Sequence, residues 1–430
     1  MEKLLLCLQK NATNSPEKIE HREKKMITNT VKTKTLKKKN QDISTVLAFA
    51  LLPLSGFATD VYLPSLPSMA SSMGVSSIQV QLSLSLFLIS YGVSQLFVGS
   101  VLDSFGRYKL CLISLVVFGI ASLVIASTHN IYLIYFMRVI HGITTAIIIV
   151  GKRAYFVDVF SGEKLKHYLS LFSIIWSTGP IVAPFIGGYL QTHLGWESNF
   201  YFLAAFAFVM VVLEIIYSGE TLKQFSSFHI GNIAGVYARM IRTSSFSLGI
   251  VMLGLAYTMV MVYNMTGPFI IEHHLKLSPV VAGYSSLFLG LAWMVGGFAG
   301  KATINRPFFR KMFVNHGFQI AFAVAMIISI SFIENLYSMI FFAFIIHVTA
   351  GYTFNNYFTF CLGKFPKNAG IASGLTGGIT YVIVSFLSYG IIEFLPAKDE
   401  YNLGYSYLIL AILSMIVMTT IFNMKEKSSE

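Results

Sequence analysis

Long apolar segments dominate this sequence and constrain its fold more than any other feature. A helix needs about 20 apolar residues to cross the hydrocarbon core of a bilayer, and twelve segments of the chain meet that requirement. Only 12% of the residues are charged and 55% are hydrophobic, a composition too apolar for an ordinary soluble protein. We therefore expect an all-α membrane protein with twelve transmembrane helices, over residues 43–66, 78–101, 110–128, 130–151, 166–190, 199–218, 246–271, 279–300, 312–332, 336–361, 368–394 and 404–423.

Lysine and arginine are distributed unevenly between the two sides of this arrangement. If the N-terminus is cytoplasmic, 28 of the 31 basic residues fall in cytoplasmic tails and loops, and the outer loops hold only Lys276 and Lys398. An excess of basic residues marks the cytoplasmic side. We expect a multi-pass protein of the bacterial inner membrane with both termini in the cytoplasm. The net charge of +12 then reflects topology and contact with anionic lipid, and we expect no nucleic-acid partner.

Both ends of the chain are polar. Residues 1–42 carry the basic run VKTKTLKKKN and are expected to form a flexible cytoplasmic tail, with residues 424–430 as a second, shorter tail. The apolar core of MEKLLLCLQK is too short for a signal peptide. Met26 is an alternative start to Met1.

The sequence contains no recognisable constellation for catalysis or metal binding. Cys7, Cys111 and Cys361 have no paired spacing, so we predict neither a disulfide framework nor a metal site. The segment GFAGKAT, residues 297–303, lacks the glycine spacing of a phosphate-binding loop. Twelve helices with short loops leave no room for a soluble catalytic domain. We expect a protein that is not an enzyme and needs no cofactor.

The chain matches itself when it is shifted by 201 residues. Residues 85–88 meet residues 286–289, both reading SLFL, and Pro67 meets Pro268. Duplicated halves are a common plan of transporters, and the match predicts two six-helix halves. The expected organisation is a tail over 1–42, a first bundle over 43–218, a cytoplasmic linker over 219–245, a second bundle over 246–423 and a tail over 424–430.

The two copies differ in their charged residues. Asp60 corresponds to Met261, and Asp103 corresponds to Ile304. We therefore expect the charged chemistry to lie in the first half and the second half to be the more apolar partner.

The loop GSVLDSFGRYK follows the second apolar segment. Gly99 is expected to let helices approach, Gly106 permits a tight turn, and Asp103, Arg107 and Lys109 place opposite charges at the cytoplasmic edge. This loop resembles the G-x-x-x-D-x-x-G-R-x-K/R motif of the major facilitator superfamily. The resemblance implies that Asp103 and Arg107 clasp the two halves and gate alternating access. An ordinary basic turn is the alternative.

The fourth apolar segment contains YFMRVIHGITTA. It resembles the R-x-x-Q-G motif of proton-linked members of the superfamily, with Arg138 and Gly142 matching and His141 in place of the glutamine. A buried guanidinium needs an acceptor. His141 follows Arg138 by three residues, so both lie on one helix face. A packed, neutral histidine is the alternative for His141.

The fifth apolar segment contains SIIWSTGPIVAPFIGGYL. Prolines kink a helix and glycines allow close packing. The pairs Gly179-Pro180 and Gly187-Gly188 resemble the motif that distinguishes exporters from importers in the superfamily. A generic kinked helix is the alternative.

Residues 43–423 together resemble one branch of the superfamily. The segments ATDVYLPSLP, GWESNF, ETL after the sixth apolar segment and AGIASGLTGG are similar to the bicyclomycin-resistance (Bcr/CflA) branch of the drug:proton antiporters. In this branch an acidic residue at the Asp60 position takes part in proton and substrate exchange. A second acid found two helical turns earlier in some drug exporters is replaced here by Leu52.

Asp60 stands alone as a charge in the first apolar segment, where a carboxylate is unfavourable unless it has a use. At 1.5 Å per residue, Asp60 and Arg138 lie at a similar depth of roughly 10–12 Å below the outer surface. We predict that they face each other. Our hypothesis is that Asp60 takes up a proton from outside and releases it inside, while its pairing with Arg138 changes. A fixed structural counterion is the alternative.

Aromatic and amide side chains are expected to line a central cavity on helices 1, 7, 8 and 10. Aromatic walls suit bulky, partly apolar ligands. His347 is expected to be packed, and Glu214 and Glu393, near helix ends, are expected to extend outward. The candidates for the cavity are Tyr62, Tyr257, Tyr263, Asn264, Trp293, Phe354, Asn355, Asn356 and Tyr357.

These features indicate a proton-coupled secondary transporter that exports drugs or other small organic compounds. A dedicated exporter of one metabolite, such as a siderophore or an amino-acid derivative, is the alternative. An importer and a non-transporting sensor are less well supported, because the fifth segment resembles exporters and both Asp60 and Arg138 are present. The expected partners are a small-molecule substrate, protons and the lipid bilayer, and we expect a monomer.

Overall fold

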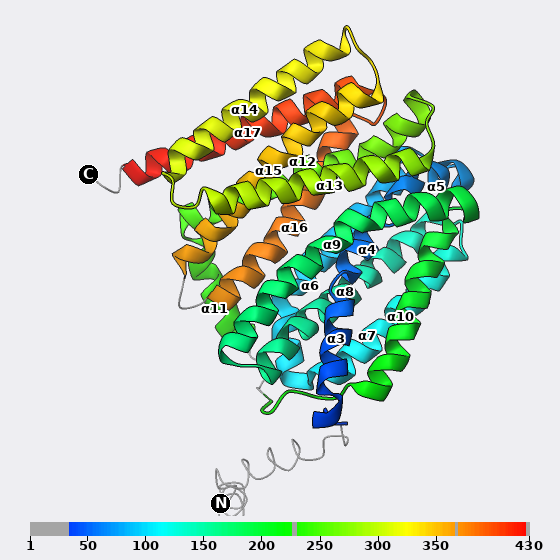
Figure 1. Cartoon of the computed structure of the whole chain (residues 1–430), viewed down its shortest axis with the longest axis vertical. Coiled ribbons are helices and arrows are strands. Elements are labelled where there is room, and N and C mark those ends of the chain that lie inside the picture. The colour runs from blue at the N-terminus through cyan, green and yellow to red at the C-terminus, as the bar shows by residue number, and fades with distance from the viewer. Residues whose placement is uncertain (1–33, 226–229, 366–368, 427–430) are drawn as a thin grey trace, which may run out of the picture.

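The computed structural model describes residues 34–225, 230–365 and 369–426, which form a nearly all-helical molecule (Figure 1). The helices up to the linker are η1 (Lys38–Asn40), α3 (Gln41–Leu51), α4 (Leu54–Asp60), η2 (Leu63–Ser65), α5 (Leu66–Met73), α6 (Ser77–Phe105), α7 (Arg107–Ala126), α8 (Ile131–Val159), α9 (Gly162–Leu194) and α10 (Glu197–Tyr217). Those that follow are α11 (Ile230–Ile241), α12 (Ser244–Phe269), η3 (Ile270–His274), α13 (Pro279–Ala302), α14 (Phe308–Ile330), α15 (Leu336–Lys364), α16 (Ala369–Phe394) and α17 (Glu400–Glu426).

Eleven spans among the described residues are long and apolar enough to cross a membrane. They agree with eleven of the predicted segments within a few residues at most ends. The remaining segment corresponds to α9, which has 33 residues. It is not among the eleven, and several of its side chains lie outside the described residues. The total of twelve transmembrane helices therefore stays a prediction.

The first span, called helix 1 below, is broken, although the sequence predicts one continuous helix over residues 43–66. It consists of α3, α4, η2 and α5, with interruptions after Leu51 and after Asp60. Proline has no N–H to continue the helical hydrogen bonds. Pro53 therefore leaves the carbonyl of Phe49 without its helical donor, and Pro64 does the same to Asp60. The prolines thus end α4 at the residue that carries the buried carboxyl.

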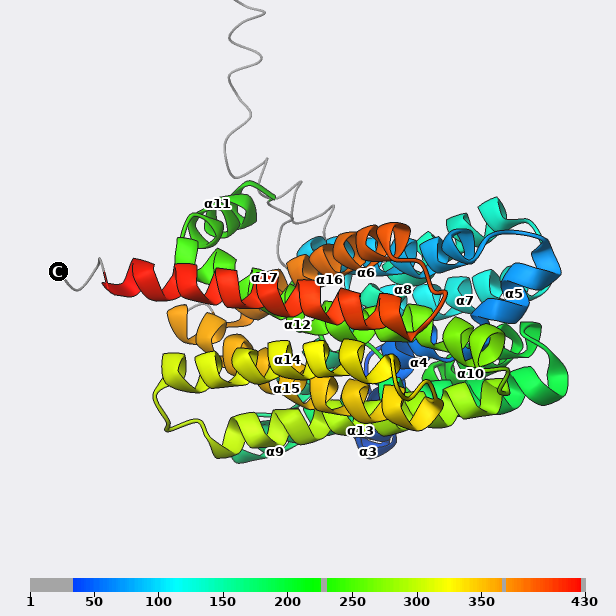
Figure 2. The same ribbon diagram turned by 90° about the horizontal axis from the view of Figure 1, so that it is seen from above.

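Two large clusters of buried apolar side chains form the core. One is built mainly from helices α3 to α10, and the other mainly from α12 to α17. Figures 1 and 2 show α7 and α10 on one side of the molecule and α14 and α17 on the other. Met261 and Met265 of α12 and Val384 of α16 belong to the first cluster, so the two groups of helices interlock. The division into two six-helix halves stays a prediction.

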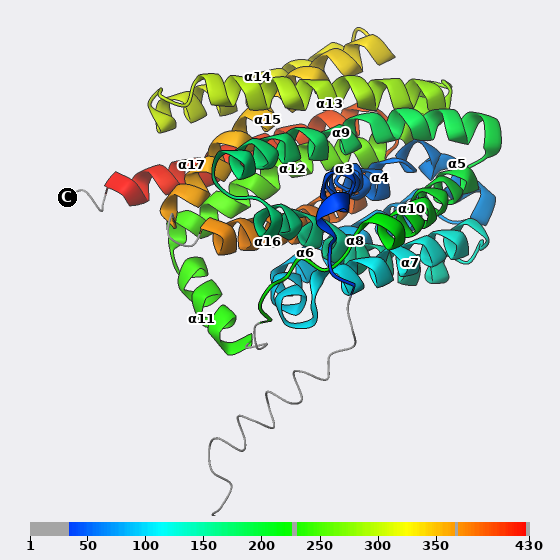
Figure 3. The same ribbon diagram turned by 60° about the horizontal axis from the view of Figure 1, so that its bottom comes forward.

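The predicted linker contains a helix of its own. Within residues 219–245, α11 lies at the edge of the helix bundle (Figure 3). The hydroxyl of Tyr237 on α11 donates to the carbonyl oxygen of Leu96 on α6 at 3.0 Å. This contact fixes α11 against the first group of helices.

The last part of the predicted flexible tail is ordered. The N–H of Leu36 donates to the carbonyl oxygen of Glu220 at 3.2 Å, and the N–H of Glu220 donates to the carbonyl oxygen of Lys34 at 2.7 Å. The ammonium of Lys34 donates to the carbonyl oxygens of Ile215 and Ile216 at the end of α10. The tail prediction was therefore wrong for residues 34–42, and residues 1–33 lie outside the described residues.

Candidate functional site

Arg138 of α8 binds the backbone where α4 ends. The last carbonyl groups of a helix have no helical donor, and Arg138 Nη1 donates to one of them, the oxygen of Ala58, at 2.8 Å. Its Nη2 donates to the hydroxyl of Tyr62 at 3.4 Å. The guanidinium lies 4.6 Å from the ring centre of Tyr62 and 4.5 Å from that of Phe87. The fully buried arginine thus stabilises the break in helix 1.

Asp60 is also fully buried, but it does not pair directly with Arg138. Among the described residues no ion pair joins the two side chains, so the predicted facing pair is not formed in this conformation. Asp60 Oδ1 accepts from Asn264 Nδ2 of α12 at 3.4 Å, and Oδ2 has no hydrogen-bond partner in the described part of the chain. The two side chains lie close enough to interact electrostatically, as predicted, but Arg138 donates to a backbone acceptor two residues before Asp60 and not to the carboxylate.

His141 lies on the same face of α8 as Arg138, as its spacing predicted. Arg138 Nη1 lies 3.3 Å from His141 Nδ1, and since arginine can only donate, Nδ1 must accept. His141 Nε2 then carries the hydrogen, which faces the hydroxyl of Ser122 at 3.0 Å and the carbonyl oxygen of Phe118 at 3.3 Å. The geometry indicates a neutral histidine that holds Arg138 in place.

Aromatic side chains form a continuous series across the interface between the two groups of helices. The rings of Tyr257, Trp293 and Phe354 lie 5.2–6.2 Å apart, so these three candidates lie together, and the cavity itself stays a prediction. Tyr257 also contacts Tyr381 of α16 at 5.8 Å, and Tyr381 contacts Tyr91 of α6 at 4.9 Å. Tyr91 and Tyr381 were not among the predicted residues, because single tyrosines on apolar helices carry no local signal.

The structure does not bring the other cavity candidates into this group. Tyr62 belongs to the Arg138 site, and Tyr263 lies against His347, 5.7 Å away, in the second apolar cluster. The ring of Tyr357 contacts those of Phe308 and Phe360. Asn355 and Asn356 lie against Gly300 of α13. Of the predicted amides, Asn264 alone contacts Asp60 in the described residues.

The glycines of α9 allow the close approaches that the motif predicted. A methyl group on Gly187 would overlap the carbonyl oxygen of Val61, directly after Asp60. One on Gly188 would lie 2.8 Å from the carbonyl oxygen of Pro279 on α13, and one on Gly179 would lie 2.6 Å from that of Pro53. Pro180 lies against Gly56 of α4. The helix therefore contacts both interruptions of helix 1 and the start of α13.

The loop between α6 and α7 is held by contacts within the first group of helices. Arg107 Nη2 donates to Asp103 Oδ1 at 2.9 Å, and Arg107 also pairs with Asp158 of α8. The Glu220 carboxylate accepts from the N–H of Tyr108 at 3.0 Å. In the described residues these contacts do not reach α12–α17, so the clasp between two halves stays a prediction.

The glycines of this loop have different roles. Gly106 has a φ of +91°, which favours glycine, and a methyl group there would lie 2.7 Å from the carboxylate of Glu220. A methyl group on Gly99 would have no described atom within 4 Å, so the expected close helix approach at Gly99 was wrong. Lys109 is exposed.

A buried ion pair joins α8 and α10 near this loop. Lys152 Nζ lies 2.7 Å from Glu214 Oε1, and both side chains are less than a tenth exposed. The expectation that Glu214 extends outward was wrong, because a buried lysine from another helix satisfies it. The two residues are 62 positions apart, so no local pattern links them.

Comparison with known proteins places the chain in a family. The Major Facilitator Superfamily profile matches residues 48–389. The chain belongs to this superfamily. It is a multi-pass membrane transporter, and the resemblance that the sequence motifs indicated is confirmed.

Named relatives extend this similarity. The chain is 30% identical over 341 residues to the uncharacterized MFS-type transporter YdgK of Bacillus subtilis, covering 76% of this chain and 83% of the relative. It is 25% identical to the multidrug resistance protein MdtL of Shewanella oneidensis, covering 88% and 96%. A shorter match, 31% identical and covering 43% and 48%, is to a bicyclomycin resistance protein homolog of Haemophilus influenzae.

Solved structures share the fold. The nucleoside transporter NupG superimposes with a TM-score of 0.69 at 13% identity, covering 90% of this chain and 99% of NupG. The human organic anion transporter MFSD10 superimposes with a TM-score of 0.59 at 15% identity, covering 88% and 99%. At these identities the likeness concerns the fold alone.

Proposed function

We propose that this transporter exports drugs or other small organic compounds in exchange for protons by alternating access. The observation that carries the proposal is the Asp60 carboxyl, which is fully buried with one oxygen lacking a described partner. It lies between the end of α4 and Asn264 of α12, where the two groups of helices meet. The relatives named for multidrug and bicyclomycin resistance support the drug substrates and the direction of transport.

In this mechanism Asp60 is the group that exchanges the proton. A carboxyl with so few partners is stable in the buried site when it is protonated, and it needs water or a cation when it is ionised. Arg138 is occupied by the Ala58 carbonyl and the Tyr62 hydroxyl, and His141 holds it there. Movement at the break after Asp60 would free the guanidinium to meet the carboxylate. The pairing of Asp60 with Arg138 thus belongs to another stage of the cycle.

The aromatic series gives the substrate a site near this carboxyl. Tyr257, Trp293 and Phe354 offer ring faces, and Tyr91 and Tyr381 continue the wall between α6 and α16. Flat, partly apolar compounds suit such walls. A substrate that reaches Asn264 would compete with its contact to Asp60, which links substrate binding to proton release.

The proposal includes the membrane arrangement. The transporter spans the bacterial inner membrane with twelve helices in two six-helix halves, joined by residues 219–245, and both termini lie in the cytoplasm. The loop of Asp103 and Arg107 gates the cytoplasmic side, and the Gly-Pro and Gly-Gly pairs of α9 permit helix 1 to move. The protein acts as a monomer, and the proton gradient supplies the energy without a cofactor.

The test uses everted membrane vesicles with an acid interior and a pH-sensitive dye. Antibiotics, lipophilic cations, amino acids and siderophores are added in turn to vesicles with wild type, Asp60→Asn or the control Asp42→Asn, which changes an exposed carboxylate of α3. We expect several unrelated drugs to discharge the gradient in wild type and control, and the rate to fall at least about tenfold in Asp60→Asn.

Two other outcomes are informative. Unchanged discharge in Asp60→Asn would contradict the role of Asp60. Discharge by one metabolite and by none of the drugs would replace the drug exporter with a dedicated exporter of that compound.

A further inference from the structure

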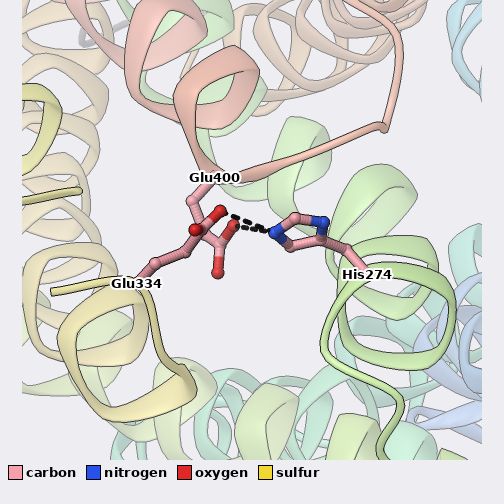
Figure 4. Close-up of side chains that lie close together, drawn as sticks. All are labelled: His274, Glu334 and Glu400. Atoms are coloured by element: carbon pink, nitrogen blue, oxygen red, sulfur yellow. Dashed lines mark hydrogen bonds and ion pairs between the residues drawn. The ribbon is translucent and has the colours of Figure 1, made fainter. Parts of the chain in front are cut away.

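Three side chains that can bind a metal ion meet where the connections of the second group of helices come together. His274 ends η3, Glu334 lies between α14 and α15, and Glu400 is the first residue of α17. His274 Nε2 lies 2.7 Å from Glu334 Oε1 and 3.1 Å from Glu400 Oε2 (Figure 4). None of these residues takes part in the transport mechanism proposed above.

Glu400 is the unusual member of this cluster. Its side chain is only 1% exposed, and apart from the contact of Oε2 with His274 Nε2 its carboxylate oxygens have no hydrogen-bond partner among the described residues. A buried carboxylate with so few partners is unfavourable. Metal ions bind carboxylates in the ionised form, so a cation bound here would keep Glu400 ionised.

The positive charge of a protonated His274 does not balance the two carboxylates of this cluster. His274 offers a single nitrogen, Nε2, to two carboxylates, and one N–H can serve only one of them well. Even a protonated imidazole leaves one negative charge in excess. A divalent cation in place of that proton would neutralise both carboxylates and give the Glu400 carboxylate a partner of full charge.

We propose that His274, Glu334 and Glu400 form a binding site for a divalent transition-metal ion, for which Zn²⁺ is the best match. The three donor atoms lie within 4.8 Å of one another, so one ion could contact all of them after small side-chain movements. One imidazole nitrogen and two carboxylate oxygens suit Zn²⁺, whereas Mg²⁺ and Ca²⁺ prefer oxygen ligands alone. Glu334 and His274 are exposed, which gives the ion an entry path and leaves a position for water.

The backbone positions His274 for this role. η3 is a π-helical turn, in which the N–H of Leu275 donates to the carbonyl oxygen of Ile270 at 2.9 Å. Such turns are frequent at functional sites. The neighbouring His273 has its ring 5.7 Å from that of Phe269 and is not part of the cluster. His273 is therefore a matched control on the same turn.

Our earlier expectation of no metal site rested on cysteine spacing, which carries no information about such a cluster. His274, Glu334 and Glu400 are far apart in the sequence and meet only in the fold. An ion there would connect the end of η3, the loop between α14 and α15, and the start of α17. We expect it to stabilise the second group of helices against unfolding.

The test measures Zn²⁺ binding to the full-length protein in detergent, purified with a tag that contains no histidine and stripped with a chelator. Calorimetric titration is done on wild type, His274→Ala, Glu334→Gln, Glu400→Gln and His273→Ala, with thermal denaturation of each protein with and without Zn²⁺. We expect one Zn²⁺ per chain and a higher denaturation midpoint in wild type and His273→Ala. His274→Ala and Glu334→Gln should each weaken binding at least about tenfold.

These two variants change exposed side chains, so the test does not depend on the folding of Glu400→Gln. Equal affinity of wild type and His274→Ala, or no saturable binding to wild type, would overturn the site. Equal affinity for Ca²⁺ would overturn its assignment to a transition metal.

Discussion

Helix 1 and α12 occupy matching positions in the internal repeat but differ in structure. Helix 1 is interrupted twice, whereas α12 runs without a break over 26 residues. The two prolines at the interruptions, Pro53 and Pro64, correspond to Gly254 and Met265 in α12. Neither counterpart lacks an N–H, so α12 keeps its helical hydrogen bonds at these two positions, and its own proline, Pro268, lies in its last turn. Prolines at these two positions thus distinguish the broken helix from the continuous one.

The two helices also differ in the buried charges that lie on or next to them. In the first group of helices the carbonyl freed by the break binds Arg138, and Asp60 follows two residues later. In α12 the Asp60 position holds Met261, an apolar residue that needs no partner. The end of α4 offers the buried Arg138 a backbone partner, whereas α12 carries no charge at the corresponding position. In this protein the buried charges therefore lie where helix 1 is broken.

Arg138 and His347 extend this comparison to α8 and α15. Each lies four residues before a glycine, Gly142 or Gly351, that allows close contact with the backbone of a neighbouring helix. Arg138 reaches across to helix 1, whereas His347 Nδ1 contacts the carbonyl oxygen of Ala343 in its own helix at 2.8 Å. Arg138 thus joins two helices. His347 is packed within its own helix, as expected.

The largest effect is expected from Arg138→Met. The change leaves the Ala58 carbonyl and His141 Nδ1 buried without their donor, and each orphaned group costs about 1–3 kcal/mol. We expect loss of transport and a large fall in the thermal denaturation midpoint in detergent. His347→Leu is the control in α15 and should lower the midpoint much less. An equal fall of the denaturation midpoint in the two variants would contradict the different roles of Arg138 and His347.

A smaller effect is expected from Gly187→Ala, because its methyl group overlaps the carbonyl oxygen of Val61 at the break. Overpacking of this kind typically costs about 1–3 kcal/mol. Gly188→Ala faces α13 with a less severe clash and should cost less, and Gly99→Ala, with open space, should cost nothing measurable. The denaturation midpoints and transport rates of the three variants show in which order the substitutions destabilise the protein. A reversed order of Gly187 and Gly188 would show that α9 depends more on α13 than on helix 1.

The smallest effect is expected from Met261→Leu. Methionine and leucine have similar volumes, and such exchanges usually cost less than about 1.5 kcal/mol. Transport in everted vesicles should stay close to wild type, in contrast to Asp60→Asn. Loss of transport in Met261→Leu with an unchanged denaturation midpoint would mean that the second copy also takes part in the chemistry.

The sequence predicted the parts of the fold that depend on local patterns. Eleven spans follow from runs of apolar residues, and the turn at Gly106 and the close contacts of Gly187 and Gly188 follow from glycine positions. The breaks in helix 1 could have been found as well, because Pro53 and Pro64 stand in the sequence. They were missed because the apolar run continues through them.

The contacts of the candidate site were harder to predict, because they join residues far apart in the chain. The depth of Arg138 was estimated well enough to place it near Asp60. Its actual partner, the Ala58 carbonyl, depended on where α4 ends. The Lys152–Glu214 pair and the Tyr91–Tyr381 contact carry no pattern at short range. Such contacts depend on how each helix is rotated toward its neighbours, and a single sequence does not give that rotation.

The contact of Lys34 with the last carbonyls of α10 has a consequence for the first six predicted helices. The segment before α3 is bound to the segment after α10, through Lys34 and through the backbone pairing of Leu36 with Glu220. The beginning and the end of this part of the chain are therefore neighbours. Neighbouring termini are the geometry in which a protein tolerates circular permutation. In a chain limited to residues 34–220, a short bridge between the two ends would let the chain start at α6 and keep the contacts within this part.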